Sequence, residues 1–342
     1  MSDMQPKNLR SKVAKFLRFL SKRLFRFLAE CLLFLTALWC FSALVFCAGN
    51  NASTGWGAAL VFAGLALTVR TFTPTRRGMF LQIVLFLPVM VWFYRLEPVP
   101  GTVYQTPWAK SAGVQFFGDR IAVRNVRDFH YRTETDYDVR YRSEIFDPRE
   151  AQDLYLAVSH WDGQEKIAHT MLSFGFRDGR HIVLSVETGV PVGMEQNALA
   201  GLFKQFRLAM VWGTESDILQ LRTKFRRETL YFYPTSVSPE DVGTLFRVLM
   251  HTTAERERRP VFYNTLVRNC TTELARPALP FLFGGGLDLR LLLNGFFDEL
   301  IEDSGFLKLL GSLHREKNRN RIPEFLPGGD AGYSADIRRF ER

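Results

Sequence analysis

The sequence predicts an α+β domain preceded by three transmembrane helices, and three observations indicate this fold class. Three apolar stretches occupy most of residues 27–94, two strand-like segments flank a Gly-containing turn at 177–180, and helix-start signals follow at Ser238 and Asn269. A chain of 342 residues with 47% hydrophobic residues can bury a sizeable core. We therefore expect a basic N-terminus at 1–26, a membrane anchor at 27–94 and one α+β domain at 95–342.

The membrane anchor is predicted from the lengths of the apolar stretches. Phe27–Ala48 is apolar apart from Glu30 and small polar residues, and it is long enough to cross about 30 Å of hydrocarbon. Trp56–Val69 and Met79–Tyr94 are shorter. Three spanning helices are the favoured interpretation, and a re-entrant pair formed by the second and third stretches is the alternative.

The distribution of charge excludes a nucleic-acid-binding domain and predicts an orientation. The formal net charge is +9, and all of it lies within the first 94 residues, because residues 95–342 carry 33 basic and 33 acidic side chains. A neutral domain has no broad field to attract phosphates. The Lys and Arg excess instead flanks the apolar stretches, which places the N-terminus and the 70–77 loop in the cytoplasm and residues 95–342 on the other side.

One cysteine is a candidate nucleophile. Three of the four cysteines lie in the first apolar stretch, so Cys270 is the only one in residues 95–342. Asn269 is a good helix N-cap and Pro277 ends or kinks a helix, so Cys270 is expected at the first position of a short helix. Unpaired N–H groups there favour a thiolate and can stabilise an oxyanion. An inert buried cysteine is the alternative.

A predicted hairpin brings a histidine and a glutamate together. A three-residue loop, Arg177–Gly179, places alternate residues from Ala168 to Phe176 on one apolar face with Ile182, Leu184 and Val186. His169 and Glu187 then lie opposite each other on the other face, with Cβ atoms about 5 Å apart. A two-residue loop at Asp178-Gly179 would divide the apolar set and separate this pair, so we favour the longer loop.

These residues together predict nucleophilic catalysis. Glu187 would hold the imidazole of His169, and His169 would deprotonate Cys270. An exposed His–Glu pair of small energetic value is one alternative. A zinc site made by His160, Asp162, His169 and His181 is another, but their spacing fits no zinc motif, so we expect neither a metal nor a cofactor. The charged stretch Arg120–Tyr141 is expected to be a solvated strand surface, with a lipid head-group or substrate contact as the alternative.

The elements after the hairpin are mostly helical. Thr214–Arg226 is expected to form a helix and Leu230–Tyr233 a strand. Ser238-Pro239-Glu240-Asp241 combines an N-cap, a proline at the first helical position and early acidic residues, so a helix should begin there.

Several of these segments resemble one family. Ile167–Phe176 (IAHTMLSFGF), Leu184–Thr188 (LSVET) and Tyr263–Glu273 (YNTLVRNCTTE) are similar to the periplasmic domain of Lnb-type bacterial lipoprotein N-acyltransferases. Arg124–Tyr131 and the segment around Leu291–Leu300 add to the likeness, which extends over roughly 115–342. In the characterised acyltransferases the periplasmic domain precedes the membrane helices, whereas here three helices precede it.

The resemblance implies a fold and an activity. The fold is a circularly permuted papain-like arrangement related to NlpC/P60 proteins, with the histidine before the cysteine, as in the order His169, Glu187, Cys270. The activity is acyl transfer: Cys270 would form an acyl-thioester from phospholipid and pass the acyl group to an amine such as a lipoprotein N-terminus. The protein would lie in the bacterial inner membrane with its C-terminal domain in the periplasm. A cysteine peptidase or amidase acting on cell-wall peptide and a non-catalytic membrane-anchored binding module are the alternatives.

Overall fold

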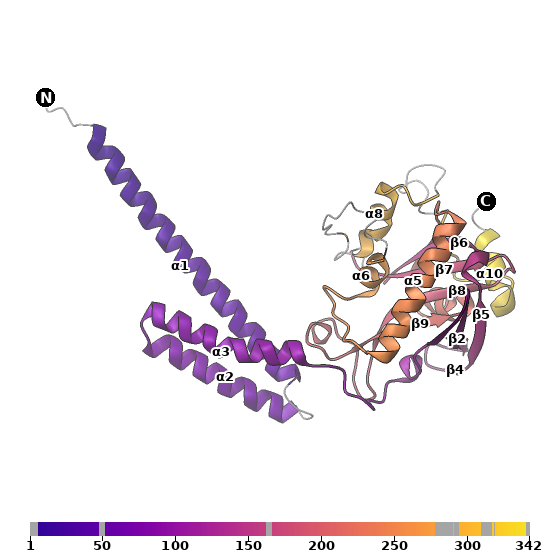
Figure 1. Ribbon diagram of the computed structural model, residues 1–342, viewed down its shortest axis with the longest axis horizontal. Coiled ribbons are helices and arrows are strands. Elements are labelled where there is room, and N and C mark those ends of the chain that lie inside the picture. Colours follow the sequence, from indigo (N-terminus) through magenta and orange to yellow (C-terminus); the bar gives the residue numbers. More distant parts are fainter. Residues whose placement is uncertain are drawn as a thin grey trace. The chain divides into compact units, whose positions relative to one another are not determined.

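The computed structural model describes residues 6–47, 52–161, 166–277, 290, 294–308, 317 and 319–339. The chain divides into two compact units, Met1–Leu96 and Glu97–Arg342 (Figure 1).

The first unit consists of three long helices, α1 (Pro6–Cys47), α2 (Ala52–Phe72) and α3 (Thr75–Arg95). Each contains a stretch that is long and apolar enough to cross a membrane, namely Phe16–Cys47, Ser53–Phe72 and Arg76–Arg95. The second and third stretches are 20 residues long, longer than the apolar runs in the sequence, because flanking residues continue the helices.

The one acidic residue of the first apolar stretch has a partner in the next helix. Both carboxylate oxygens of Glu30 accept hydrogen bonds from the guanidinium of Arg70, at 2.9 and 3.0 Å. Pairing reduces the cost of placing a charged group in an apolar helix. The contact therefore joins α1 to α2 in a specific register.

The second unit is built around an eight-stranded sheet. Its strand order is β1-β2-β9-β8-β7-β6-β10, with β5 also paired to β2, and among the strand pairs of the described residues only β2–β9 is parallel. The strands are β1 (Gly113–Phe117), β2 (Arg120–Arg127), β5 (Tyr141–Phe146), β6 (Ala151–His160), β7 (Ala168–Phe176), β8 (His181–Gly189), β9 (Arg207–Gly213) and β10 (Thr229–Pro234). A separate two-stranded ribbon is formed by β3 (His130–Tyr131) and β4 (Tyr137–Asp138).

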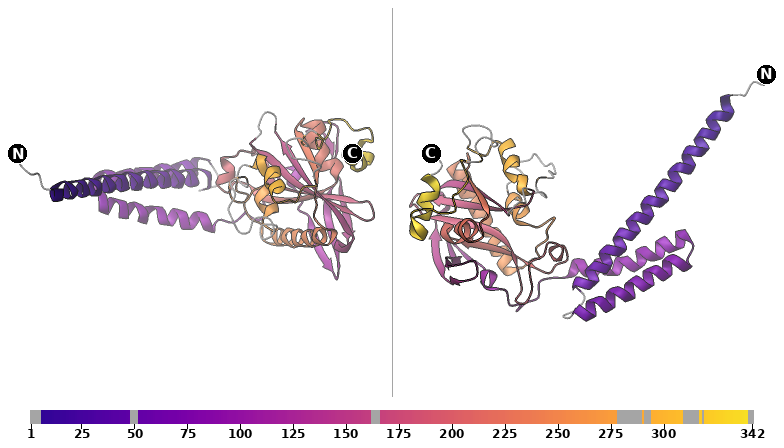
Figure 2. Two further views of the ribbon diagram at one scale, coloured as in Figure 1. Left: turned by 90° about the horizontal axis from the view of Figure 1, so that it is seen from above. Right: turned by 180° about the vertical axis from the view of Figure 1, so that it is seen from behind.

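Helices cover both faces of the sheet (Figures 1 and 2). One face packs against α5 (Pro239–Arg258), α6 (Cys270–Ala275) and α8 (Phe297–Asp303), and the other against α4 (Glu215–Gln220) and α10 (Gly329–Arg339). A π-helical turn, Leu221–Phe225, continues α4. Short 3₁₀ turns lie at Thr106–Trp108, Pro148–Glu150, Ala200–Leu202 and Asn294–Phe296. The α+β class is thus confirmed, and the papain-like permutation stays a prediction.

The β7–β8 hairpin has the predicted three-residue loop. Phe174 pairs with Ile182, the N–H of Phe176 donates to the carbonyl of Arg180, and Gly179 has a φ of 83°. This left-handed conformation is open to glycine at little steric cost, which explains the residue at this turn. The predicted apolar face also holds, because Ala168, Leu172, Phe174, Phe176, Ile182, Leu184 and Val186 all lie in one core cluster.

The downstream elements also follow the local signals closely. Ser238 caps α5, and its side chain accepts from the N–H of Asp241. Asn269 caps α6 in a capping box, so Cys270 is its first residue, as predicted. The helix expected over Thr214–Arg226 begins after Thr214 but becomes π-helical after Gln220, and the strand expected at Leu230–Tyr233 is β10.

Candidate active site

His169 is held by a buried serine in the neighbouring strand. It lies near the start of β7 with 8% of its surface exposed, and its Nε2 is 2.7 Å from the hydroxyl oxygen of Ser185 in β8. The same hydroxyl donates to Oε1 of Glu187 at 2.8 Å. The predicted His169–Glu187 association therefore exists, but Ser185 stands between the two side chains.

This chain of contacts fixes the tautomer of the imidazole. Ser185 has one hydroxyl proton, and it goes to the Glu187 carboxylate, so the serine oxygen can only accept from His169. The proton of a neutral imidazole is then on Nε2, and Nδ1 keeps its lone pair. Nδ1 has no hydrogen-bond partner within the part of the chain that the structure describes. It is the ring nitrogen that can accept a proton.

Glu187 is kept ionised by a set of cationic and N–H groups. The indole N–H of Trp108 donates to Oε2 at 2.6 Å, Nη2 of Arg222 lies 3.5 Å from Oε1, and Nη1 of Arg127 lies 4.0 Å from Oε2. Burial alone would raise the pKa of this carboxyl, but Arg127, Arg222, His169 and the Ser185 hydrogen bond together lower the pKa of Glu187 to about 2. The group is thus a permanent acceptor at neutral pH.

Burial and nearby positive charge keep His169 neutral. Burial lowers its pKa well below the usual value, and the nearby positive charges of Arg222 and Arg226 lower it further, against the opposing effect of Glu187. A neutral imidazole is the form that can remove a proton from a thiol. Because His169 is buried and only 11% of the Glu187 side chain is exposed, the exposed cross-strand pair considered from sequence is wrong.

Cys270 lies beside the first residues of β7. Its sulfur is 4.0 Å from the carbonyl oxygen of Ala168 and 3.8 Å from the hydroxyl of Thr271, and the residue is 4% exposed. The hydroxyl of Thr271 in turn lies 3.1 Å from that of Thr170. Tyr263 is close by: burial raises its pKa, and Cys270 raises the pKa further. The short helix α6 thereby holds the sulfur next to the backbone that carries His169.

The structure does not join the sulfur directly to the imidazole. Cys270 belongs to the core cluster on the α5 and α6 side, together with Ala168, whereas Ser185 and Met171 share the opposite face of the sheet with His169. Among the described residues, no hydrogen bond connects Cys270 to His169. Two of the three predicted residues, His169 and Glu187, are therefore joined through Ser185. The third, Cys270, lies against β7, the strand that carries His169.

Four residues near the site were not predicted from sequence: Trp108, Arg127, Ser185 and Arg222. Arg127 and its neighbour Asp128 are only 2% and 4% exposed, so the solvated surface expected for Arg120–Tyr141 is wrong at these two positions. Arg127 donates to both oxygens of Asp217 in α4, at 2.9–3.1 Å, and this pairing offsets the cost of burying it. Arg132 and Arg140 in the same stretch form ion pairs with aspartates and are exposed.

The zinc alternative finds no support among the described residues, which contain no group of three potential metal ligands; Asp162 lies outside them. His160 packs edge-on against Tyr231 instead, with ring centroids 5.6 Å apart. Residues 291–293, at the start of the Leu291–Leu300 segment, also lie outside the described part of the chain.

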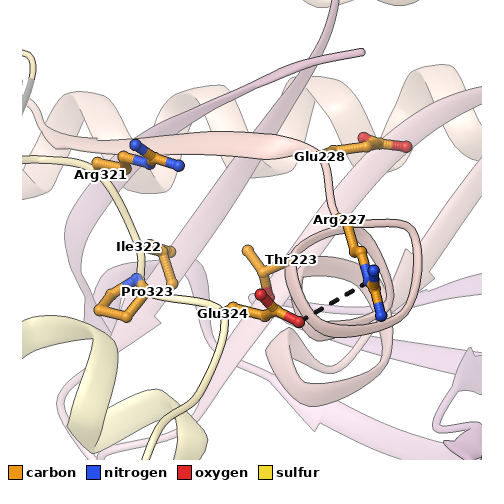
Figure 3. Close-up of a pocket in the computed structure, with 7 residues that line it drawn as sticks. All are labelled: Thr223, Arg227, Glu228, Arg321, Ile322, Pro323 and Glu324. Carbon is orange, nitrogen blue, oxygen red and sulfur yellow. Dashed lines mark ion pairs between the residues drawn. The ribbon is translucent and has the colours of Figure 1, made fainter. Parts of the chain in front are cut away.

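A separate hollow of about 250 Å³ lies beside Glu228, which forms an ion pair with Arg222 (Figure 3). Its lining residues are Thr223, Arg227, Glu228, Arg321, Ile322, Pro323 and Glu324. Glu228 also contacts Arg222 at 3.3 Å and accepts from Ser159, which pairs with His169 across β6 and β7. The hollow contains both acidic and basic side chains, and Arg227 and Glu324 face each other across it.

A comparison with protein families finds a match within the larger unit. Residues 137–292 match the model described as the Lnb N-terminal periplasmic domain. This segment resembles the periplasmic domain of Lnb-type lipoprotein N-acyltransferases. The match is shorter than the 115–342 expected from sequence, but it contains His169, Ser185, Glu187 and Cys270. No curated protein and no solved structure matches the chain.

The Lnb-like segment and the three apolar helices together describe a membrane protein with a periplasmic domain. In this chain the helices come before the Lnb-like segment. Trp108 and Arg127 lie outside the matched residues although they contact Glu187.

Proposed function

We propose that the Lnb-like domain is a thiol acyltransferase. Cys270 attacks an ester carbonyl of a phospholipid, forms an acyl-thioester and releases a lysophospholipid. An amine, such as the N-terminus of a lipoprotein, then attacks the thioester, forms an amide and restores the thiol. The observation that carries the proposal is the oriented His169–Ser185–Glu187 chain, which joins β7 to β8, together with the contact of Cys270 with β7.

Each residue has a role that follows from its surroundings. Nδ1 of His169 takes the proton of the Cys270 thiol and gives it to the departing alkoxide. In the second step it takes a proton from the attacking amine and gives it to the departing Cys270 thiolate. Ser185 and Glu187 hold the ring in the tautomer that leaves Nδ1 unprotonated and stabilise the imidazolium that forms.

The proposal requires the sulfur and Nδ1 to come into hydrogen-bond range when substrate binds. Catalytic contacts are often longer before substrate binds than in the reacting complex. Cys270 lies against Ala168, the residue before His169, but on the opposite face of the sheet, so the proposal requires the first residues of β7 to turn His169 toward α6. The proposal also requires the sulfur, which is buried in the resting structure, to become accessible to the lipid.

The proposed setting is a bacterial inner membrane with the N-terminus in the cytoplasm. The Lys and Arg residues of α1 that precede Phe27, together with those at the adjoining ends of α2 and α3, Arg70, Arg76 and Arg77, support this orientation. An anchored enzyme meets phospholipids and lipoproteins at the membrane surface, so both proposed substrates are within its reach.

The test is mass spectrometry of the full chain after incubation with phospholipid vesicles. An acyl adduct on Cys270 that is absent from Cys270→Ser supports the thioester. Addition of a lipopeptide with a free diacylglyceryl-cysteine amine should then remove the adduct and yield the N-acyl lipopeptide. Release of free fatty acid alone, or of peptide fragments from peptidoglycan, would instead assign a hydrolase. Full biological activity of Cys270→Ala would assign a non-catalytic binding module.

A further inference from the structure

Three arginines converge on one buried carboxylate in the helix that begins with Cys270. Glu273 in α6 has 1% of its side chain exposed. Its oxygens lie 3.4 Å from Nη2 of Arg256, 3.5 Å from Nε of Arg268 and 3.2 Å from Nη2 of Arg276. Together, these four residues form the arginine cluster.

The arginine cluster has more positive charge than its single acid neutralises. Only the contact of Arg256 with Glu273 has hydrogen-bond geometry among the described residues. The Nε atoms of Arg256 and Arg268 are buried without a hydrogen-bond partner there. Buried N–H donors are normally paired, so these guanidinium groups have unused capacity to bind an acceptor.

The pKa of Arg268 also reflects the excess of positive charge in the arginine cluster. Burial lowers the pKa of Arg268, and repulsion from Arg256 and Arg276 lowers the pKa further, against the opposing effect of Glu273. Arg256 also lies 3.5 Å from Glu255, but Glu255 is exposed, so solvent weakens this pairing. An anion placed among the three guanidinium groups would relieve this repulsion.

The arginine cluster is adjacent to the candidate nucleophile. Arg268 comes two residues before Cys270, and Glu273 lies one helical turn after it, where side chains are about 5–6 Å apart at Cβ. Arg268 and Arg276 are partly exposed, with 35% and 51% of their side chains accessible, so a ligand can reach them from solvent.

We infer that Arg256, Arg268 and Arg276 bind a phosphate group, and that this group is the phosphate of the acyl-donor phospholipid. The assignment to a donor rests on the proposed function. Planar guanidinium groups bind phosphate oxygens through paired N–H donors. In a glycerophospholipid the phosphate and the ester carbonyls share one glycerol, so a phosphate held by the cluster places an ester near the start of α6.

The binding test uses the full chain in detergent as its Cys270→Ala variant, which cannot form a thioester. Calorimetry compares dihexanoylphosphatidylglycerol with dihexanoylglycerol, which has the same acyl chains and no phosphate. We expect the phospholipid to bind and Arg268→Gln or Arg276→Gln to weaken it about tenfold each, or about 1.4 kcal/mol. Arg177→Gln, which removes an exposed guanidinium paired with Glu150 at the hairpin loop, should leave it unchanged.

The outcomes separate this inference from the proposed function. Equal binding of both lipids, or no effect of the arginine substitutions in chains that keep their circular dichroism, would overturn the phosphate site. Inorganic phosphate is titrated in parallel, and binding of phosphate without any binding of the phospholipid would assign free phosphate and overturn the donor role. If Cys270 is never acylated but the variants lose lipid binding, the site stands while the proposed chemistry fails.

Discussion

The hydroxyl of Ser185 bridges His169 and Glu187, 2.7 Å from the imidazole Nε2 and 2.8 Å from the carboxylate. A direct His–carboxylate contact was expected, because residues opposite each other in a hairpin lie close at Cβ. The serine supplies both an acceptor for the ring and a donor for the acid. The orientation of His169 thus depends on a side chain that does not change its charge in the physiological pH range.

Ser185→Ala should slow acylation of Cys270 about a hundredfold, at the lower end of what general acid–base catalysis contributes. The substitution leaves Nε2 of His169 without its acceptor and removes the preference for the Nε2–H tautomer. It should also destabilise the fold by about 1–3 kcal/mol, because a buried polar group loses its partner. The measurement is the rate of adduct formation by mass spectrometry.

Ser173→Ala is the matched control for this variant. Ser173 is also buried in the β7–β8 hairpin and also donates to a buried glutamate, Glu215, which does not contact His169. It should lose comparable stability without losing the rate of acylation. Equal rates for Ser185→Ala and the wild type would contradict the relay.

Folding stability should fall as the pH drops below about 6.5. The pKa of His169 is lowered in the folded state, so the unfolded chain binds a proton in this range that the folded chain does not, and each pH unit costs up to about 1.4 kcal/mol. The Glu187 contribution, with a folded pKa of about 2, is lost only at lower pH, as the pH falls from about 4.5 toward 2.

The pH effect can be divided by substitution. Thermal unfolding of the full chain in detergent, followed between pH 8 and 5.5, should show a shallower decline for His169→Gln. The pKa of His181 is also lowered by burial, so His181→Gln should remove a second share of the slope. An unchanged pH dependence in His169→Gln would show that His169 is not held neutral.

Arg127→Met should destabilise the domain by about 3–5 kcal/mol, because it leaves the buried carboxylate of Asp217 without its bidentate partner. Adding Asp217→Asn should recover part of the loss. Arg132→Met is the control, since Arg132 makes exposed ion pairs with Asp136 and Asp138, and solvent-screened pairs of this kind contribute little to stability. Chemical denaturation measures all three, and equal losses for Arg127 and Arg132 would refute the importance of burial.

Gly179→Ala should cost about 1–2 kcal/mol, since its φ of 83° is unfavourable for a residue with a Cβ. The added Cβ would meet no atom within 4 Å, so the loss is conformational and not a steric clash. Gly179→Asn should cost less, because asparagine tolerates the left-handed region better. If alanine and asparagine are equally harmful, the loop conformation is not the cause.

Local patterns predicted the parts of the fold that depend on local physics. Alternation of apolar residues around Gly179 was sufficient to choose the hairpin register, and Asn269 with its capping box placed Cys270 at the start of α6. The three apolar stretches similarly indicated α1, α2 and α3.

The interactions that were missed join residues far apart in the chain. Arg127 and Arg222 are separated by 95 positions and meet only because β2 and the turn after α4 converge on Glu187. A charged residue in a strand is usually exposed, so its burial depends on a partner that periodicity does not reveal. Ser185 was missed for a similar reason, because strand pairing does not determine which side chains form hydrogen bonds across it.

The central claim, that His169 activates Cys270, is tested most directly by the alkylation of that cysteine. The rate of reaction of Cys270 with iodoacetamide is measured by mass spectrometry on the folded full chain at pH 7, for the wild type, His169→Gln and the control His181→Gln. An ether-linked phospholipid, which has no ester to acylate the thiol, is present so that the substrate-bound state is the one measured. The account predicts a rate about tenfold or more lower in His169→Gln and an unchanged rate in the control. Equal rates in all three proteins, or a Cys270 that reacts only after unfolding, would contradict it.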